Sequence, residues 1–237
     1  MKTLVLNAAT NKDGNTQFLL KIMKDIFDEN EIETYEISSH YDEIFPCVDC
    51  KRLKKGCYIE GKCIYQDKLS LLLDLDTGFL NEFNNIILAS PIRQSALTGQ
   101  MMILSERLQV LYVRRAMLKL NDVITPKLGV RIFVGGGCGE PDIALRKSCD
   151  IFFELNASRK KENKVVSLQT DIVPAWKDEI AIEYAKFLAL KMVERTFKKA
   201  GKEIAPSQID KVRAWEDENY ANTLASEMIK RALIKKN

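Results

Sequence analysis

The chain has 237 residues, a formal net charge of +3, six cysteines and one histidine. This length fits one domain with additions or two small domains, and a hydrophobic content of 46% excludes a chain that is disordered throughout. The low net charge gives no reason to expect a nucleic-acid partner, and no apolar run is long enough to span a membrane. The sequence begins without the apolar segment of a secretory signal, so we expect a cytoplasmic protein.

Short apolar runs alternate with amphipathic segments along the chain. We expect strands at residues 3–7, 34–37, 85–90, 128–134 and 165–168, and helices at about 15–29, 67–75, 98–120, 141–155 and 177–199. Repeated strand–helix units are typical of a parallel sheet that is covered on both faces, and right-handed crossovers favour a doubly wound sheet. The pattern therefore predicts a flavodoxin-like α/β fold with five parallel strands in the order 2-1-3-4-5.

Two parts of the chain are additions to this core, which spans residues 1–200. Residues 40–66 contain four cysteines and form an irregular segment that is too long for a simple connection. Residues 201–237 are predicted to be a helical extension that begins at Pro206. Its apolar face must be buried on the same subunit or on a partner, and it comprises Leu224, Met228, Ile229, Ala232 and Leu233.

Ligands of doubly wound sheets bind at the carboxyl ends of the strands, and three loops at this edge are distinctive. Residues 7–17 are polar and lead into a helix N-terminus, where backbone N–H groups attract an anion. The alternative is that Asn15 or Thr16 caps this helix and that no ligand binds. Residues 90–100 follow the third strand. Residues 135–139 contain four glycines, which expose the backbone to a flat ligand, and a flexible loop is the alternative. Together the three loops predict a site for a phosphorylated planar cofactor.

These loops resemble those of the NADPH-dependent FMN reductase-like branch of the flavodoxin superfamily. The similarity covers roughly residues 1–200 and rests on Gly14-Asn15-Thr16, on Ser90-Pro91 through Gly99-Gln100 with Glu106-Arg107, and on Gly135-Gly136-Gly137. The resemblance implies an FMN cofactor, with its phosphate on the first loop and its ring between the other two. It implies no catalytic side chain, because the flavin itself carries the redox chemistry.

By matched position, the resemblance assigns the phosphate to Thr10, Asn11, Asn15, Thr16 and Gln17. It assigns one side of the ring to Pro91, Ile92, Arg93 and Gln94, and the other side to Gly135, Gly136 and Gly137. The first loop departs from the family pattern at residues 8–11, where Ala8-Ala9-Thr10-Asn11 stand in place of Gly, a phosphate-binding Ser, Pro and Arg. The loss of one hydroxyl and one cation should weaken phosphate binding, although backbone donors remain.

Four cysteines have the spacing C-x2-C-x6-C-x5-C and are Cys47, Cys50, Cys57 and Cys63. Thiolates are soft ligands, and four of them suit an iron–sulfur cluster or tetrahedral zinc. Their position after the second strand resembles that of the cysteines in the iron–sulfur flavoproteins, a subgroup of the same family. In that subgroup the third cysteine usually follows the second after two residues, where this chain has Leu53. A [4Fe–4S] cluster, structural zinc and free thiols are the three alternatives.

The resemblance implies an FMN-dependent oxidoreductase or a pure electron-transfer flavoprotein. Electrons would pass from NAD(P)H or a ferredoxin-like donor to a small-molecule acceptor, by way of a [4Fe–4S] cluster if one is present. A cluster and a flavin must lie close together, which usually requires a loop from a neighbouring subunit, so we expect a homodimer or homotetramer. The alternative function is a flavodoxin-like scaffold that has lost flavin and serves as a zinc-stabilised binding or regulatory module.

Overall fold

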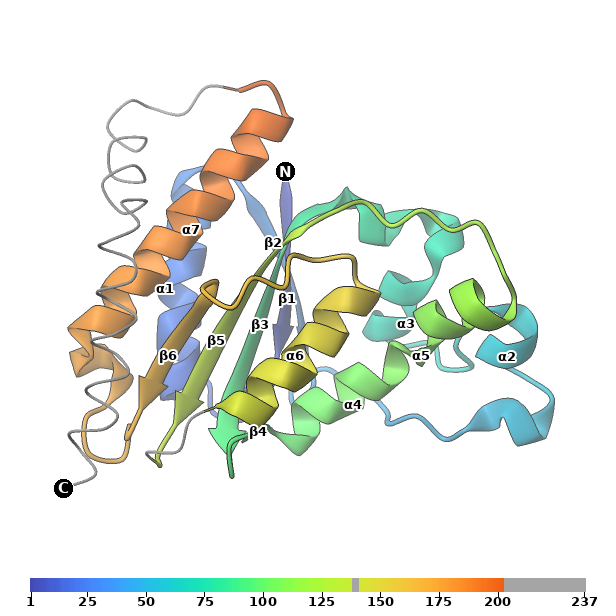
Figure 1. Cartoon of the computed structure of the whole chain (residues 1–237), viewed down its shortest axis with the longest axis horizontal. Helices are drawn as coiled ribbons and strands as arrows, with labels where there is room; N and C mark the ends of the chain where they lie inside the picture. The colour runs from blue at the N-terminus through green and yellow to red at the C-terminus, as the bar shows by residue number, and fades with distance from the viewer. Residues whose placement is uncertain (138–140, 203–237) are drawn as a thin grey trace.

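A computed structural model of the chain describes residues 1–137 and 141–202. Its centre is a parallel sheet in which the strands lie in the order β2-β1-β3-β5-β6 (Figure 1). These strands are β1 (Lys2–Asn7), β2 (Glu33–Ser38), β3 (Phe83–Arg93), β5 (Leu128–Gly135) and β6 (Lys164–Leu168). The sequence did not predict β4 (Ala96–Leu97), which pairs antiparallel with β3. When β4 is set aside, the parallel strands have the predicted order 2-1-3-4-5.

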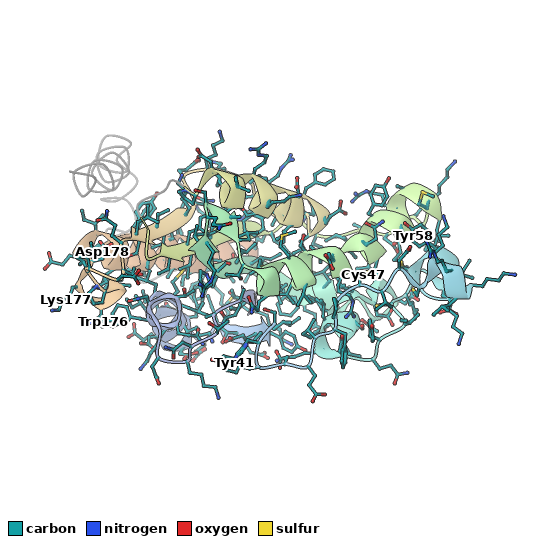
Figure 2. The ribbon with its side chains drawn as sticks, turned by 90° about the horizontal axis from the view of Figure 1, so that it is seen from below. Tyr41, Cys47, Tyr58, Trp176, Lys177 and Asp178 are labelled. Carbon is teal, nitrogen blue, oxygen red and sulfur yellow. The ribbon has the colours of Figure 1, made fainter. Side chains whose placement is uncertain are left out.

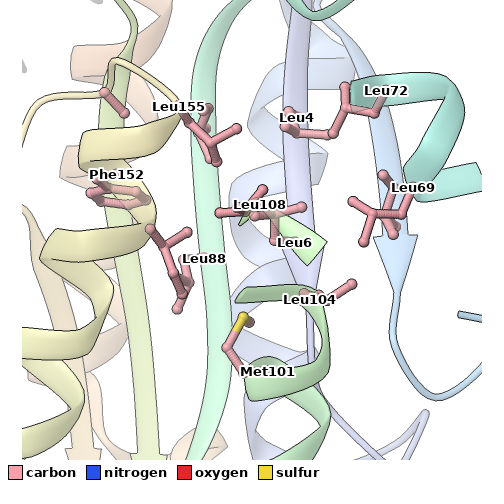
Figure 3. Close-up of a cluster of buried hydrophobic side chains, with 14 of the residues drawn as sticks. Leu4, Leu6, Leu69, Leu72, Leu88, Met101, Leu104, Leu108, Phe152 and Leu155 are labelled. Atoms are coloured by element: carbon pink, nitrogen blue, oxygen red, sulfur yellow. The ribbon is translucent and has the colours of Figure 1, made fainter. Parts of the chain in front are cut away.

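Helices cover both faces of the sheet (Figure 1). One face carries α1 (Asn15–Glu29) and α7 (Glu179–Lys199), and the other carries α3 (Lys68–Leu73), α4 (Gly99–Arg107) and α6 (Asp142–Glu154). Because side chains alternate along a strand, Leu4, Leu6 and Leu88 pack into the second layer, whereas Val5 and Ile87 pack against α1 and α7. Figure 3 shows side chains of α3, α4 and α6 packed around these leucines.

Most element boundaries agree with the sequence pattern. Helix α1 has the predicted bounds, and Asp67 caps α3 by accepting a hydrogen bond from the Ser70 amide at 2.8 Å. Shorter helices lie between the core elements: α2 (Cys57–Glu60), α5 (Gln109–Tyr112) and 3-10 turns at Cys50–Leu53, Leu75–Thr77, Phe79–Glu82 and Ala175–Lys177. No helix in the described residues is long and apolar enough to cross a membrane. The predicted extension at 201–237 lies almost wholly outside the described residues, which end at 202.

The prediction of one continuous helix over residues 98–120 was wrong. The structure divides this stretch into α4, α5 and a π-helical turn at Val113–Met117. Two buried arginines explain the interruption, because each needs acceptors from another part of the chain. Arg107 ends α4, and Arg114 lies in the wider turn, where it donates to the Gly61 carbonyl at 3.0 Å and to the carboxylates of Asp76 and Asp122.

Arg107 holds the cysteine segment, residues 40–66, against the core. Its side chain is only 1% exposed and donates two hydrogen bonds, of 2.7 and 3.0 Å, to the Asp67 carboxylate. It also donates to the Phe45 carbonyl at 2.8 Å and lies over the Tyr65 ring at 4.8 Å. The segment is thus attached to one guanidinium near both of its ends, and Arg114 attaches it again at Gly61.

The Asp67–Arg107 pair should make stability depend on pH in the acid range. Burial acts to raise the pKa of Asp67, but hydrogen bonds from Arg107 and Ser70 outweigh burial and hold this pKa below its usual range. The unfolded chain therefore binds the proton more readily. The pair's contribution to the unfolding free energy is fully present above the usual Asp pKa of about 3.9 and is lost as the pH falls through the lower folded value.

We expect Asp67→Asn to lower the unfolding free energy at neutral pH by about 3–5 kcal/mol, because Arg107 would stay buried without a counter-charge. Urea titrations between neutral and acid pH should also show a flatter acid limb for this variant. Asp76→Asn is the matched control. It also removes a carboxylate partner from a buried arginine, Arg114, but the Asp76 side chain is 53% exposed and therefore screened by water. If the two variants lost the same unfolding free energy, the buried Asp67–Arg107 pair would be no more stabilising than an exposed one.

Candidate functional site

A cavity of about 770 Å³ lies at the carboxyl edge of the sheet, after β1, β3, β5 and β6. It is lined by Ala9, Thr10, Asn11, Gly14, Asn15, Thr16, Pro91, Ile92, Arg93, Gln94, Val134, Gly136, Gly137, Thr170 and Asp171. All the residues that the sequence assigned to a cofactor line this cavity except Gln17 and Gly135. The Gln17 side chain instead accepts a hydrogen bond from Asn7 at 3.1 Å, and Gly135 is the buried last residue of β5.

The first loop is shaped by Asn7, which sequence reasoning did not select. Its side-chain oxygen accepts a hydrogen bond from the Ala9 amide at 2.8 Å, and its side-chain nitrogen donates to Gln17 and to Glu36. Tyr41 adds a bond from its hydroxyl to the Thr10 carbonyl at 3.0 Å. An amide side chain at the buried end of a strand is the signal that could have identified Asn7.

The first turn of α1 keeps its backbone donors free at the cavity. The N-cap is Gly14, which has extended backbone and no side chain with which to cap the helix. The Asn15 side-chain oxygen accepts from the Ala175 amide at 2.8 Å instead, so the alternative in which Asn15 or Thr16 caps the helix was wrong. Within the described residues, the N–H groups of Asn15, Thr16 and Gln17 have no acceptor. Free amides at the positive end of a helix dipole attract an anion.

The second wall is the hairpin between β3 and β4. Its two central residues, Gln94 and Ser95, both have positive φ, of 51° and 62°. Two-residue hairpins with a type I′ turn require positive φ at both central residues, but residues with a Cβ atom adopt it at a cost. The hairpin is also attached to α6, because Ala144 donates its amide to the Ser95 carbonyl at 2.9 Å. Arg93, at the cavity side of the turn, is exposed and forms no ion pair with the described residues.

Ser95→Gly should stabilise the protein, since glycine adopts positive φ without the steric cost of a Cβ atom. We expect the unfolding free energy to rise by about 1 kcal/mol, partly offset by the greater freedom of glycine in the unfolded chain. Thermal or urea unfolding would measure the change. Ser95→Ala keeps the Cβ atom and is the control, which should show no gain. A glycine variant that is no more stable than this alanine variant would show that the turn is unstrained.

The third wall combines the glycine loop with a loop after β6 that sequence reasoning missed. Gln169 donates its amide to the Gly137 carbonyl and Thr170 donates to the Gly135 carbonyl, both at 3.1 Å. A Cβ atom on Gly136 would lie 2.2 Å from a carboxylate oxygen of Asp171, so any larger residue at this position would displace the exposed Asp171 side chain. A Cβ atom on Gly137 would meet open space, which leaves the backbone there accessible to a ligand.

The four cysteines lie on the cysteine segment and differ in exposure. Cys50 and Cys57 are each 8% exposed, Cys63 is half-buried and Cys47 is exposed. Burial raises the pKa of Cys57 to about 11, and the charges of the other three thiols add to the effect, so all four lie within electrostatic reach of one another. Within the described residues, however, no group of three or more His, Cys, Asp or Glu side chains is arranged to hold a metal ion.

The cysteine segment and the cavity occupy different parts of one edge of the molecule. Figure 2 looks at the structure from below, toward the carboxyl ends of the strands. It shows Cys47 and Tyr58 at one end, Tyr41 between, and Trp176, which follows the third wall in the chain, at the other end. Tight backbone packing shapes the segment around Cys50, because Asp49 and Gly56 have positive φ and a Cβ atom on Gly56 would lie 2.4 Å from the Cys50 sulfur.

Comparison with known proteins identifies the fold but no family. No family model matches the sequence, and no curated protein matches it. Among solved structures, an azoreductase from Bacillus anthracis str. Sterne has a TM-score of 0.56 and 13% identity, and the match covers 82% of this chain and 99% of that chain. An FMN-dependent NADH-azoreductase from Bacillus anthracis str. Ames Ancestor, solved in complex with FMN, has a TM-score of 0.55 and 11% identity over 81% of this chain and 100% of that chain.

RosB, solved with the bound intermediate 8-demethyl-8-formylriboflavin-5'-phosphate, has a TM-score of 0.54 and 14% identity, and the match covers 84% of this chain and 81% of that chain. At such identities the likeness is one of fold alone. The parallel order of the strands and these matches together show that the chain has a flavodoxin-like α/β fold, which it shares with the two azoreductase structures.

Proposed function

We propose that the protein is an FMN-dependent oxidoreductase that takes electrons from NAD(P)H and passes them to a small-molecule acceptor. The observation that carries the proposal is the uncapped first turn of α1, which offers free amides to an anion at one end of the cavity. The fold likeness to an NADH-azoreductase that was solved with FMN supports the same choice of cofactor and donor.

The cavity suits FMN in volume and in the arrangement of its donors. About 770 Å³ lies within the range of small-molecule sites, roughly 300–1,000 Å³. The amides of Asn15, Thr16 and Gln17 would hold the phosphate, with added hydroxyls from Thr10 and Thr16. The hairpin and the glycine loop would enclose the ring. Backbone donors thereby compensate for the hydroxyl and cation that the first loop lacks at residues 8–11.

The residues of the chain would bind and orient the cofactor. Bound FMN supplies hydride and single-electron chemistry, so the protein needs no acid or base of its own. Asn7 fixes the first loop, and the glycine loop lets backbone come close to the ring. Arg93 would place a positive charge beside the ring. Among the described residues that line the cavity it is the single cation, and positive charge favours a reduced, anionic flavin.

Gly14→Asp should separate phosphate binding from helix stability. A carboxylate at the N-cap accepts hydrogen bonds from the first-turn amides, so we expect the unfolding free energy to rise, by roughly a few tenths of a kcal/mol because glycine is itself a fair N-cap residue. The same carboxylate repels the phosphate, and FMN affinity should fall at least about tenfold, while the affinity for riboflavin, which has no phosphate, stays the same. Fluorescence titration of the apo-protein would measure both flavins.

Gly14→Ala is the matched control, since it adds a Cβ atom without a charge or a cap. Its tight contacts would both be with Asn11, at 3.2 Å to the Cβ atom and 3.3 Å to the carbonyl oxygen. An FMN affinity that is unchanged in the aspartate variant would contradict the assignment of the phosphate to α1. Wild-type protein that binds no flavin would overturn the proposed function and favour the binding or regulatory module.

The cysteine segment supports a second element of the proposal, a metal centre at Cys47, Cys50, Cys57 and Cys63. Four thiolates are the ligands of a [4Fe–4S] cluster and equally of structural zinc. The thiols influence one another electrostatically but are not arranged about a common point, so we assign no step of the reaction to a metal. Exposed basic residues on the same segment would suit an acidic, ferredoxin-like donor in place of NAD(P)H, and these are Lys51, Arg52, Lys54 and Lys55.

Metal analysis of protein purified without oxygen tests this element. We expect iron and acid-labile sulfide in equal amounts. Both should be lost in Cys57→Ser, because Cys57 would serve as the third ligand in place of the cysteine that the iron–sulfur flavoproteins usually have at the position of Leu53. Cys149→Ser, on α6, is the control and should keep its iron. Zinc without iron would favour the structural alternative, and protein free of both metals would leave the cysteines as thiols. Light scattering on the same sample tests for a homodimer or homotetramer.

A further inference from the structure

Asp171 is the one carboxylate among the described residues that line the cavity. It lies on the loop after β6, which the sequence pattern did not connect with a cofactor. The proposed function uses the first loop, the hairpin and the glycine loop, and leaves Asp171 without a role.

The backbone around Asp171 is fixed to the rest of the site on both sides. Gln169 and Thr170 are bonded to the glycine loop, and Gln169 closes the turn by accepting the Ile172 amide at 2.9 Å. Further along, the Ala175 amide is bonded to the side chain of Asn15 in the first turn of α1. Asp171 is therefore carried by a loop that joins the glycine loop to the proposed phosphate end.

The carboxylate of Asp171 lies against the glycine loop and has unused acceptors. Its two oxygens are 2.2 and 2.8 Å from the position of a Cβ atom on Gly136. No hydrogen bond or ion pair joins Asp171 to any described residue, and Arg93 in the hairpin does not pair with it. A ligand between the hairpin and the glycine loop would thus meet a carboxylate whose lone pairs are free.

Electrostatics decides which part of a ligand can lie there. A carboxylate repels a phosphate, whereas the free amides of α1 attract one, so a phosphorylated ligand should bring its phosphate to α1 and an uncharged part to Asp171. A flavin carries neutral donors away from its phosphate, namely the ring N–H at N3 and the hydroxyls of its ribityl chain. Hydrogen bonds from such donors to a carboxylate are stronger than those between neutral groups.

We propose that Asp171 is a specificity-determining residue of the cavity, which accepts a hydrogen bond from a ring N–H or ribityl hydroxyl of the bound flavin. This inference rests on the proposed function. The carboxylate sets the direction in which the flavin enters and disfavours a ligand with an anionic group at this wall.

The test is a titration of apo-protein with FMN and with riboflavin. Asp171→Ala should weaken the binding of both flavins by about 10- to 100-fold and leave their affinity ratio unchanged, because the lost bond does not involve the phosphate. Asp171→Asn keeps an acceptor oxygen and should recover most of the affinity. Ile172→Ala, at a neighbouring side chain that is 73% exposed and outside the cavity lining, is the control and should bind like wild type.

The outcomes separate this inference from the proposed function. The Asp171 side chain forms no bond with the described residues, so Asp171→Ala without flavin should have the same unfolding free energy as wild type. Weaker flavin binding by this variant could then not be caused by misfolding. An alanine variant that binds flavins as tightly as wild type, or gains affinity for FMN alone, overturns the inference while the proposed function stands. Wild-type protein that binds neither flavin overturns both.

Discussion

The uncapped start of α1 is the constraint around which the cavity is built. Two asparagines lie near this helix start, and asparagine is a good capping residue, yet neither side chain caps the helix here. Asn7 bonds to Ala9 and Gln17, Asn15 bonds to Ala175, and Gly14 occupies the cap position itself. A side-chain cap stabilises a helix by roughly a few tenths of a kcal/mol more than glycine does, so the chain gives up this small stability where an anion would bind. The displaced side chains are used to position the loops beside the helix.

The sequence was sufficient to predict what depends on local pattern. Apolar runs identified every strand of the parallel sheet, and apolar periodicity gave α1 its correct bounds. Three of the loops that line the cavity followed from the rule that parallel strands end at one edge of a sheet. Features set by contacts between distant residues were missed. The break after Arg107 depends on Asp67, forty residues earlier in the chain, and the role of Asn15 depends on Ala175, 160 residues later.

Asp171 and Thr170 were missed for a related reason. Their loop follows the last strand, and no motif distinguishes it from a surface turn. It reaches the cavity because the amides of Gln169 and Thr170 bond to the carbonyls of Gly137 and Gly135, a pairing that a single sequence does not reveal. The spacing of the cysteines predicted that they would gather, whereas the choice between cluster, zinc and thiols depends on distances between sulfurs that spacing does not determine.

Helix α4 joins the two unusual regions of the molecule. It begins at Gly99, directly after the hairpin that forms one wall of the cavity, and it ends at Arg107, which holds the cysteine segment. At 1.5 Å per residue, its nine residues act as a rigid strut of about 13 Å. The distance between the cavity wall and the cysteine segment is therefore set by the length of α4 and by the buried Asp67–Arg107 pair at its end.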